Sequence, residues 1–239
     1  MMNLIYRLTI ITTFILQLTV FAQSQPIMGF QGGINVTGLM GHKDNTENKP
    51  RFGLTGYVFA DIPLGRNSIV SIETGLGISQ QGNRTVADID SLTWTNTRTT
   101  RNKINYLLFP VYLKENYSNF YTKIGPYLAL LTSATSEYTN VETKGTVQFR
   151  PSTSGNNKKF EENVNSFDYG LSFGFGFIHY FDPKVHRGRS HHKKRTPIMQ
   201  VDFKYNMGFR PIDATGNIPE MNLKNSVFTF GLSFTSVND

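Results

Sequence analysis

Histidine and serine are the residues of this chain that could support acyl-transfer or hydrolytic chemistry, and their placement argues against it. Such chemistry needs a histidine within reach of a hydroxyl nucleophile and a carboxylate. Of the five histidines, His42 has no serine close to it, and His179 ends a run of alternating apolar residues. The other three lie in a basic tract, residues 184–195, where His191 and His192 have no third ligand at a metal-binding spacing. The sequence therefore predicts no enzyme, and no catalytic, cofactor-binding or metal-binding residues.

Ion pairing is the second chemistry that the residue types permit. Seven charged residues stand inside alternating apolar runs, at positions that a strand would direct to its polar face. Four are acidic and three are basic, and we expect them to form a charge network, because a buried charge needs a partner. The three lysines are the partners available to Asp61, Glu73 and Asp168, and Lys114 is expected to pair with Glu73 on the neighbouring strand. The seven residues are Asp61, Glu73, Lys114, Lys123, Asp168, Asp202 and Lys204.

The elements that must position these charges are strands with one apolar face and one small or polar face. Between Phe167 and Phe181, aromatic and aliphatic residues alternate with glycine, serine and aspartate, and residues 199–209 and 228–235 repeat the pattern. A face made mostly of glycine and serine suits the narrow lumen of a small barrel whose apolar face meets lipid. The residues expected to face lipid are Phe173, Phe175, Phe177, Phe203, Tyr205, Phe228, Phe230 and Phe234.

Eight segments of the chain read as strands, and each is long enough to cross a bilayer when tilted. We therefore predict an all-β fold, an eight-stranded antiparallel transmembrane β-barrel with up-and-down meander order; a soluble all-β domain is the alternative. The expected strands lie near residues 27–39, 51–62, 68–80, 103–116, 119–132, 164–181, 197–210 and 223–236.

The links between these segments alternate in length, which predicts an orientation. The links after the second and fourth strands are short, whereas residues 81–102 and 133–163 form long polar links. Outer-membrane barrels keep short turns in the periplasm and long loops outside, so both termini should be periplasmic. The basic tract breaks this rule and is interpreted as a solvated turn. Asp88 and Asp90, near Trp94, are interpreted as part of a solvated loop, with a loop binding site for a ligand or cation as the alternative.

The first residues resemble an export signal. Arg7 supplies the positive start, residues 8–20 form an apolar stretch, and Ala22 ends a small-residue cleavage site. We expect residues 1–22 to be a cleaved signal peptide and residues 23–239 to be the barrel domain in the outer membrane of a Gram-negative envelope.

No cysteine is present, which excludes disulfide and thiol chemistry. The net charge of +7 is concentrated in the basic tract, and an exported protein is not expected to bind nucleic acid.

Several phrases of the sequence resemble the PorT-like outer-membrane β-barrel (porin) family of Bacteroidota. They are residues 32–37 (GGINVT), 56–64 (GYVFADIPL), 71–76 (SIETGL), 106–114 (YLLFPVYLK) and 125–128 (GPYL). One departure is Leu108, which stands where this family often carries an inward glutamate. The resemblance implies a location and a fold, and little about activity.

Together these patterns predict a non-enzymatic outer-membrane barrel with a narrow, plugged lumen and no cofactor. The long links 81–102 and 133–163 are the expected interaction surface. The expected partners are outer-membrane lipid and lipopolysaccharide, the barrel assembly machinery and other envelope proteins. Two alternatives remain, a barrel that anchors an export or uptake assembly and a channel for small solutes.

Overall fold

The structure is a computed structural model that describes residues 25–40, 47–65, 68–90, 95–144, 147–148, 153–156, 163–181, 195–212 and 224–238. The predicted signal peptide, His42, Trp94 and nearly all of the basic tract lie outside these residues. Within them, no helix is long and apolar enough to cross a membrane. The strands are β1 (Ile27–Met40), β2 (Glu47–Lys49), β3 (Arg51–Pro63), β4 (Val70–Asp90), β5 (Thr95–Tyr117), β6 (Phe120–Lys144), β7 (Val147–Gln148), β8 (Thr153–Asn156), β9 (Phe167–Tyr180), β10 (Arg195–Pro211) and β11 (Lys224–Asn238).

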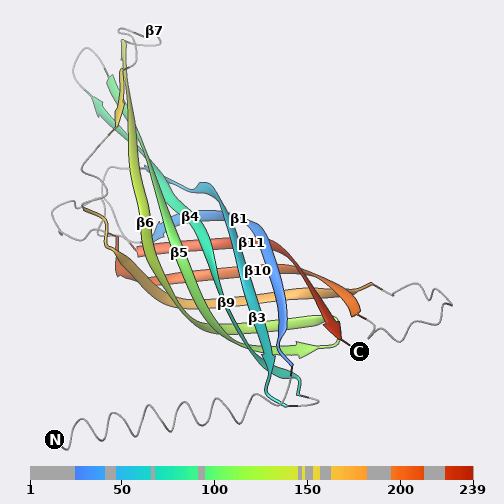
Figure 1. Cartoon of the computed structure of the whole chain (residues 1–239). Helices are drawn as coiled ribbons and strands as arrows, with labels where there is room; N and C mark the ends of the chain where they lie inside the picture. Colours follow the sequence, from blue (N-terminus) through green and yellow to red (C-terminus); the bar gives the residue numbers. More distant parts are fainter. Residues whose placement is uncertain are drawn as a thin grey trace, which may run out of the picture.

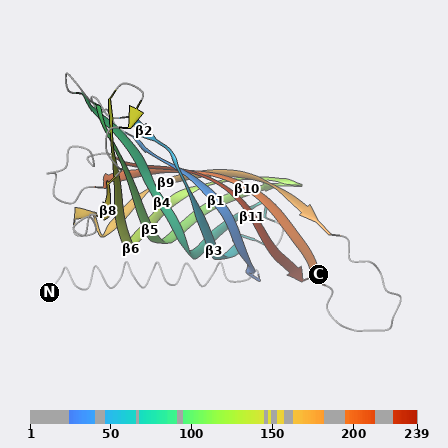
Figure 2. The ribbon, with the colours of Figure 1, turned by 90° about the horizontal axis from the view of Figure 1, so that it is seen from above.

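Eight of these strands close into a ring in which each strand pairs antiparallel with its neighbours (Figures 1 and 2). The order is β1, β3, β4, β5, β6, β9, β10 and β11, and β11 pairs back onto β1 from Gly29↔Thr235 to Met40↔Lys224. The predicted eight-stranded meander barrel is therefore confirmed. Because a closed ring has no unpaired edge, every ring strand has hydrogen-bonding partners on both sides.

The alternation read from the sequence separates two faces of the wall. On β9, Phe173, Phe175 and Phe177 are exposed on the outer face, whereas Asp168 and Ser172 are buried inside. Outer aromatic rings form a ladder from strand to strand, with centroids 5.1 Å apart for Phe175–Phe203 and 5.2 Å apart for Phe203–Phe230. All eight residues expected to face lipid lie on this outer face.

Three strands continue well beyond the ring, farther than the sequence pattern predicts. Pairing of β4 with β5 runs without interruption from Gln81↔Ile104 to Asp90↔Thr95, and β5 stays paired with β6 as far as Thr95↔Thr143. We call residues 81–90, 95–104 and 133–144 the extension. It rises past the other strands in Figure 1, with β2 paired to its β4 edge and β7 and β8 to its β6 edge.

The expected strands stopped near residues 80, 103 and 132, so the structure carries three of them farther, into the links 81–102 and 133–163. The reason lies in their composition. Thr95, Thr97 and Thr99 alternate along β5, and threonine is polar enough to suggest a loop yet is β-branched and favours strands.

The two ends of the barrel differ. At the end where β1 begins and β11 ends, which we call the terminal end, β5 turns into β6 through two residues, Ser118 and Asn119. Ser118 has a φ of 51°, the left-handed conformation that a tight turn requires. At the opposite end, Arg51 Nη1 donates to the Gln81 and Asn102 carbonyl oxygens at 3.0 and 3.3 Å, which holds the base of the extension.

Candidate functional site

The candidate site is a cluster of six charged side chains inside the barrel, all buried. They are three carboxylates and three lysines, so their formal charges balance: Asp61, Glu73, Asp202, Lys114, Lys123 and Lys204. They come from β3, β4, β5, β6 and β10, which surround the same section of the lumen. Register explains the convergence: Asp61 lies opposite Glu73, and Lys114 lies opposite Lys123.

Five of the six form a continuous chain of ion pairs across the lumen. Lys114 Nζ lies 2.8 Å from Asp61 Oδ2 and 3.3 Å from Glu73 Oε2. Lys123 Nζ lies 2.9 Å from Glu73 Oε1 and 2.6 Å from Asp202 Oδ2. The expected Lys114–Glu73 pair is therefore present, although the shorter contact of Lys114 is to Asp61. Since β3 and β10 are not neighbours in the ring, a chain from Asp61 to Asp202 must cross the lumen.

Tyrosines from the same level complete this cluster. Tyr57 donates its hydroxyl to Glu73 Oε1 at 2.9 Å, and Tyr121 donates to Asp202 Oδ2 at 2.6 Å. The ammonium of Lys114 lies 4.5 Å from the Tyr121 ring centroid, close enough for a cation–π contact. Tyr121 was not among the residues expected in the lumen. Its position two residues before Lys123, on the same face of one strand, was the pattern that could have found it.

Lys204 and Asp168 are held differently from the other charges. Lys204 Nζ donates to Gln31 Oε1 at 2.8 Å and lies 4.2 Å from the Tyr57 ring centroid. Asp168 accepts hydrogen bonds from Asn225 at 3.0 Å and from Tyr127 at 3.3 Å.

The lysine partner expected for Asp168 is not found among the residues that the structure describes. The reason is distance along β9. Gly174 is the β9 residue that lies opposite Lys123 and Lys204. Asp168 is six residues away from it, or about 20 Å at a strand's rise per residue.

An apolar cluster fills the lumen toward the extension. Its members are Ile104, Tyr106, Leu108, Tyr127, Ala129, Ala134, Val164 and Ile212. Leu108, which stands where the resembling family often has a glutamate, is thus part of this packing. Val164 and Ile212 come from segments outside the ring strands, and Asn165 N donates to the Ile212 carbonyl oxygen at 2.8 Å, tying the two segments together.

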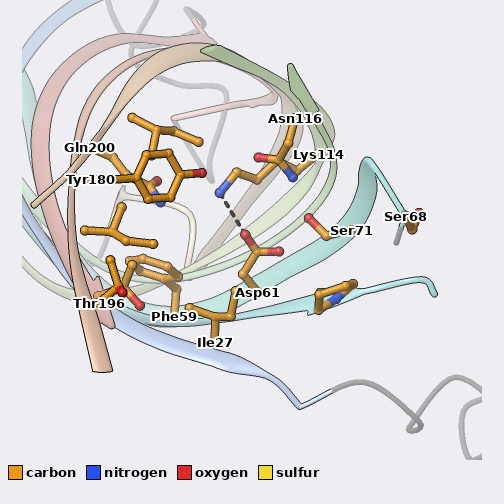
Figure 3. A pocket seen from close by; sticks show the side chains of 14 residues that line it. Ile27, Phe59, Asp61, Ser68, Ser71, Lys114, Asn116, Tyr180, Thr196 and Gln200 are labelled. Carbon is orange, nitrogen blue, oxygen red and sulfur yellow. Dashed lines mark hydrogen bonds and ion pairs between the residues drawn. The ribbon is translucent and has the colours of Figure 1, made fainter. Parts of the chain in front are cut away.

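A cavity of about 350 Å³ opens on the other side of the ion pairs, at the terminal end (Figure 3). Asp61 and Lys114 form its inner wall, and Phe59, Tyr180 and Gln200 also line it. Asp61 Oδ1 and Ser71 Oγ, both buried, make no hydrogen bond within the described part of the chain. The cavity can therefore admit water or a small polar molecule, but its inner wall is the ion-pair chain.

His179 is the one histidine among the residues that the structure describes. His179 lies on the outside of the wall, exposed, with its ring centroid 4.8 Å from that of Phe181. Among the residues that the structure describes, no three histidine, cysteine, aspartate or glutamate side chains are grouped as a metal site requires. What the cluster provides is a set of buried ion pairs that links strands across the lumen.

Comparisons with known proteins place the chain beside membrane barrels. The model of a family described as "Outer membrane protein beta-barrel domain" matches residues 21–214. Among solved structures the chain is similar to Ail, the attachment invasion locus protein of Yersinia pestis, at 10% identity and a TM-score of 0.31, covering 89% of this chain and 99% of that one. It is also similar to Neisserial surface protein A, at 9% identity and a TM-score of 0.28, covering 86% and 95%. No curated protein matches the sequence.

Proposed function

The chain belongs to the outer membrane protein β-barrel domain family, and from that premise we propose a non-enzymatic barrel with a closed lumen whose extension is an interaction surface outside the cell. In this proposal residues 1–22 are a signal peptide that is removed, and residues 23–239 form the barrel with both termini in the periplasm. The proposal retains the narrower PorT-like assignment within Bacteroidota, on the sequence phrases that resemble that family.

The observation that carries the proposal is the extension itself. Three strands stay paired for about ten residues beyond the level where the apolar outer face stops. A lipid-bounded barrel keeps polar surface out of hydrocarbon, so this sheet must stand in water. Long connections of such barrels face outward and short turns face the periplasm. The two-residue turn at Ser118 and Asn119, at the opposite end, supports an outward extension.

The lumen supports a structural role rather than transport. An eight-stranded barrel leaves room only for side chains. Here the ion-pair chain and Tyr57, Tyr112 and Tyr121 occupy that room at one level. The apolar cluster occupies it nearer the extension. A solute would have to displace paired charges from their partners, which is costly in a buried site. This argues against the channel alternative.

Surface labelling tests the orientation. Because the chain has no cysteine, a single introduced cysteine gives a unique label. Thr139→Cys places it on the extension and Asn119→Cys places it in the turn at the terminal end; both positions are exposed. A membrane-impermeant maleimide added to intact cells should label Thr139→Cys, and should label Asn119→Cys only after the outer membrane is permeabilised. The reverse pattern would invert the orientation and remove the basis of the proposal.

A further inference from the structure

A row of basic side chains crosses the outer face of the extension. Register places Lys49 opposite Arg84, Arg84 opposite Arg101, and Arg101 opposite Glu137, on four adjacent strands. All four side chains are exposed. Lys103 lies on the same face of β5, two residues nearer the ring. We call Lys49, Arg84, Arg101 and Lys103 the basic face.

The alternation of β4 and β5 shows that the basic face continues the apolar outer wall. Ile78 lies opposite Leu107, and Leu107 opposite Leu130, in the last apolar row before the extension. Ile78 is 62% exposed and Leu130 39% exposed. Side chains an even number of residues apart point to the same side of a strand. Arg84 is therefore on the same side of β4 as Ile78, and Arg101 is on the same side of β5 as Leu107. Asn83 and Asn102 point to the opposite side and are buried, and Asn102 Nδ2 donates to Asn83 Oδ1 at 2.9 Å.

The height of the basic face follows from strand geometry. Lys103 is four residues beyond Leu107, and Arg101 and Arg84 are each six residues beyond the last apolar row. At about 3.3 Å per residue and a tilt of roughly 40°, Lys103 and Arg101 stand about 10 Å and 15 Å above Leu107, and Arg84 stands about 15 Å above Ile78, the last apolar residue before the extension on each strand. The polar zone of an ordinary phospholipid leaflet is only about 5–8 Å deep. Measured from these residues, the two arginines stand beyond the depth of phospholipid phosphates.

The charges of the basic face are unusual because they repel one another. Like charges directly opposite on adjacent strands destabilise a sheet, yet Lys49, Arg84 and Arg101 are consecutive in one row. Glu137 is the single acid of that row. Within the described part of the chain, Arg84, Arg101 and Lys103 have no carboxylate within 4.0 Å. An external anion between the strands would relieve this repulsion.

We propose that the basic face binds the phosphate groups of lipopolysaccharide headgroups in the outer leaflet. This inference rests on the proposed function for its outward orientation. When its core sugars are phosphorylated, this lipid carries phosphates farther from the hydrocarbon than a phospholipid does, which matches the height of the two arginines. Neighbouring strands are about 4.8 Å apart, so Arg84 and Arg101 can hold one phosphate between them. Guanidinium groups suit this task because they bind phosphate oxygens in pairs.

The test compares purified full-length variants in detergent, by native mass spectrometry or titration calorimetry. The probes are a rough-type lipopolysaccharide with a phosphorylated core, the same lipid after chemical dephosphorylation, and inorganic phosphate. The main variant is Arg84→Gln/Arg101→Gln/Lys103→Gln. The matched control is Arg98→Gln, since Arg98 is an exposed arginine on the opposite face of the same strand, 5.0 Å from the Tyr138 ring centroid.

We expect the unaltered protein and Arg98→Gln to prefer the phosphorylated lipid by about 10-fold or more, and the triple variant to lose that preference. A triple variant that keeps the preference overturns the proposal, as does an Arg98→Gln variant that loses it equally. Inorganic phosphate competing as well as the lipid would also overturn it, by assigning the site to free anions. If the triple variant does not fold, Arg84→Gln and Arg101→Gln are tested singly. Binding in detergent does not depend on orientation, so its failure is distinct from a failure of the labelling experiment.

Discussion

Lys123 is the residue on which the electrostatics of the lumen depend most. Its ammonium lies within ion-pair distance of Glu73 and Asp202, which come from strands that are not neighbours in the ring. It is also 5.0 Å from the Tyr112 ring centroid. A buried ion pair adds little net stability over a well-packed apolar pair, but removing one partner leaves an uncompensated buried charge. Loss of Lys123 would leave Asp202 without an ion-pair partner among the described residues.

We therefore expect Lys123→Met to lower the free energy of unfolding by about 3–5 kcal/mol. The measurement is equilibrium urea unfolding of the protein refolded in lipid vesicles. Lys224→Met, at an exposed lysine at the start of β11, is the matched control and should change stability by less than about 0.5 kcal/mol. Lys123→Met combined with Asp202→Asn should cost less than the sum of the two single changes. Strict additivity would show that the ion pairs do not act as a network.

At the scale of elements, β9 shows why its inward face is made of small residues. Gly174 lies in register between Lys123 on β6 and Lys204 on β10, so the two lysine stems occupy the space above it. A Cβ at Gly176 would meet the Tyr121 hydroxyl and lie 2.5 Å from its Cζ. The glycines of one strand thus provide room for the large side chains of its neighbours. Alternation predicted the faces of β9 correctly, but the partners across the lumen depend on register, which the sequence alone does not determine.

Gly176→Ala should consequently destabilise the barrel by about 1–3 kcal/mol through overpacking. The control is Gly32→Ala on β1, an outward position where a Cβ meets nothing within 4 Å, and we expect it to be nearly neutral. Urea unfolding and the mobility difference between boiled and unboiled samples on SDS gels report both variants. Equal stability of the two variants would contradict the packing explanation.

For the whole molecule, sequence patterns were sufficient for the strand number, the meander order and the two faces of the wall. They were insufficient where polar composition and strand structure coincide. Thr85, Thr97 and Thr99 read as loop residues, yet they continue β4 and β5 into the extension. Asp168 shows a second limit. The alternation of β9 correctly predicted that its side chain points into the lumen, but its position six residues from Gly174 leaves it far from the lysines. The side of a strand on which a residue points follows from the local alternation. Its height inside the barrel, in contrast, depends on the register of every strand pair.

The proposed closed lumen gives a prediction for the whole barrel. In planar bilayers the purified protein should show no steady, porin-sized conductance, because paired charges, tyrosines and the apolar cluster are buried inside a narrow eight-stranded barrel. Lys123→Met, if it folds, should not open a large channel, since Tyr112, Tyr121 and the apolar cluster remain. Reproducible large conductance from the unaltered monomer would instead favour transport as the function.

The pairing of β1 with β11 has a consequence for biogenesis. Thr235 donates its hydroxyl to the Met28 carbonyl oxygen at 2.6 Å, although the two residues are 207 positions apart in the sequence. Closure of the ring must therefore wait for the last strand to be synthesised, and it carries the entropic cost of a very long loop. Until then β1 and β10 each have an open edge, which hydrocarbon does not tolerate. A prematurely terminated chain cannot settle in the bilayer, so ring closure itself discriminates finished molecules from fragments.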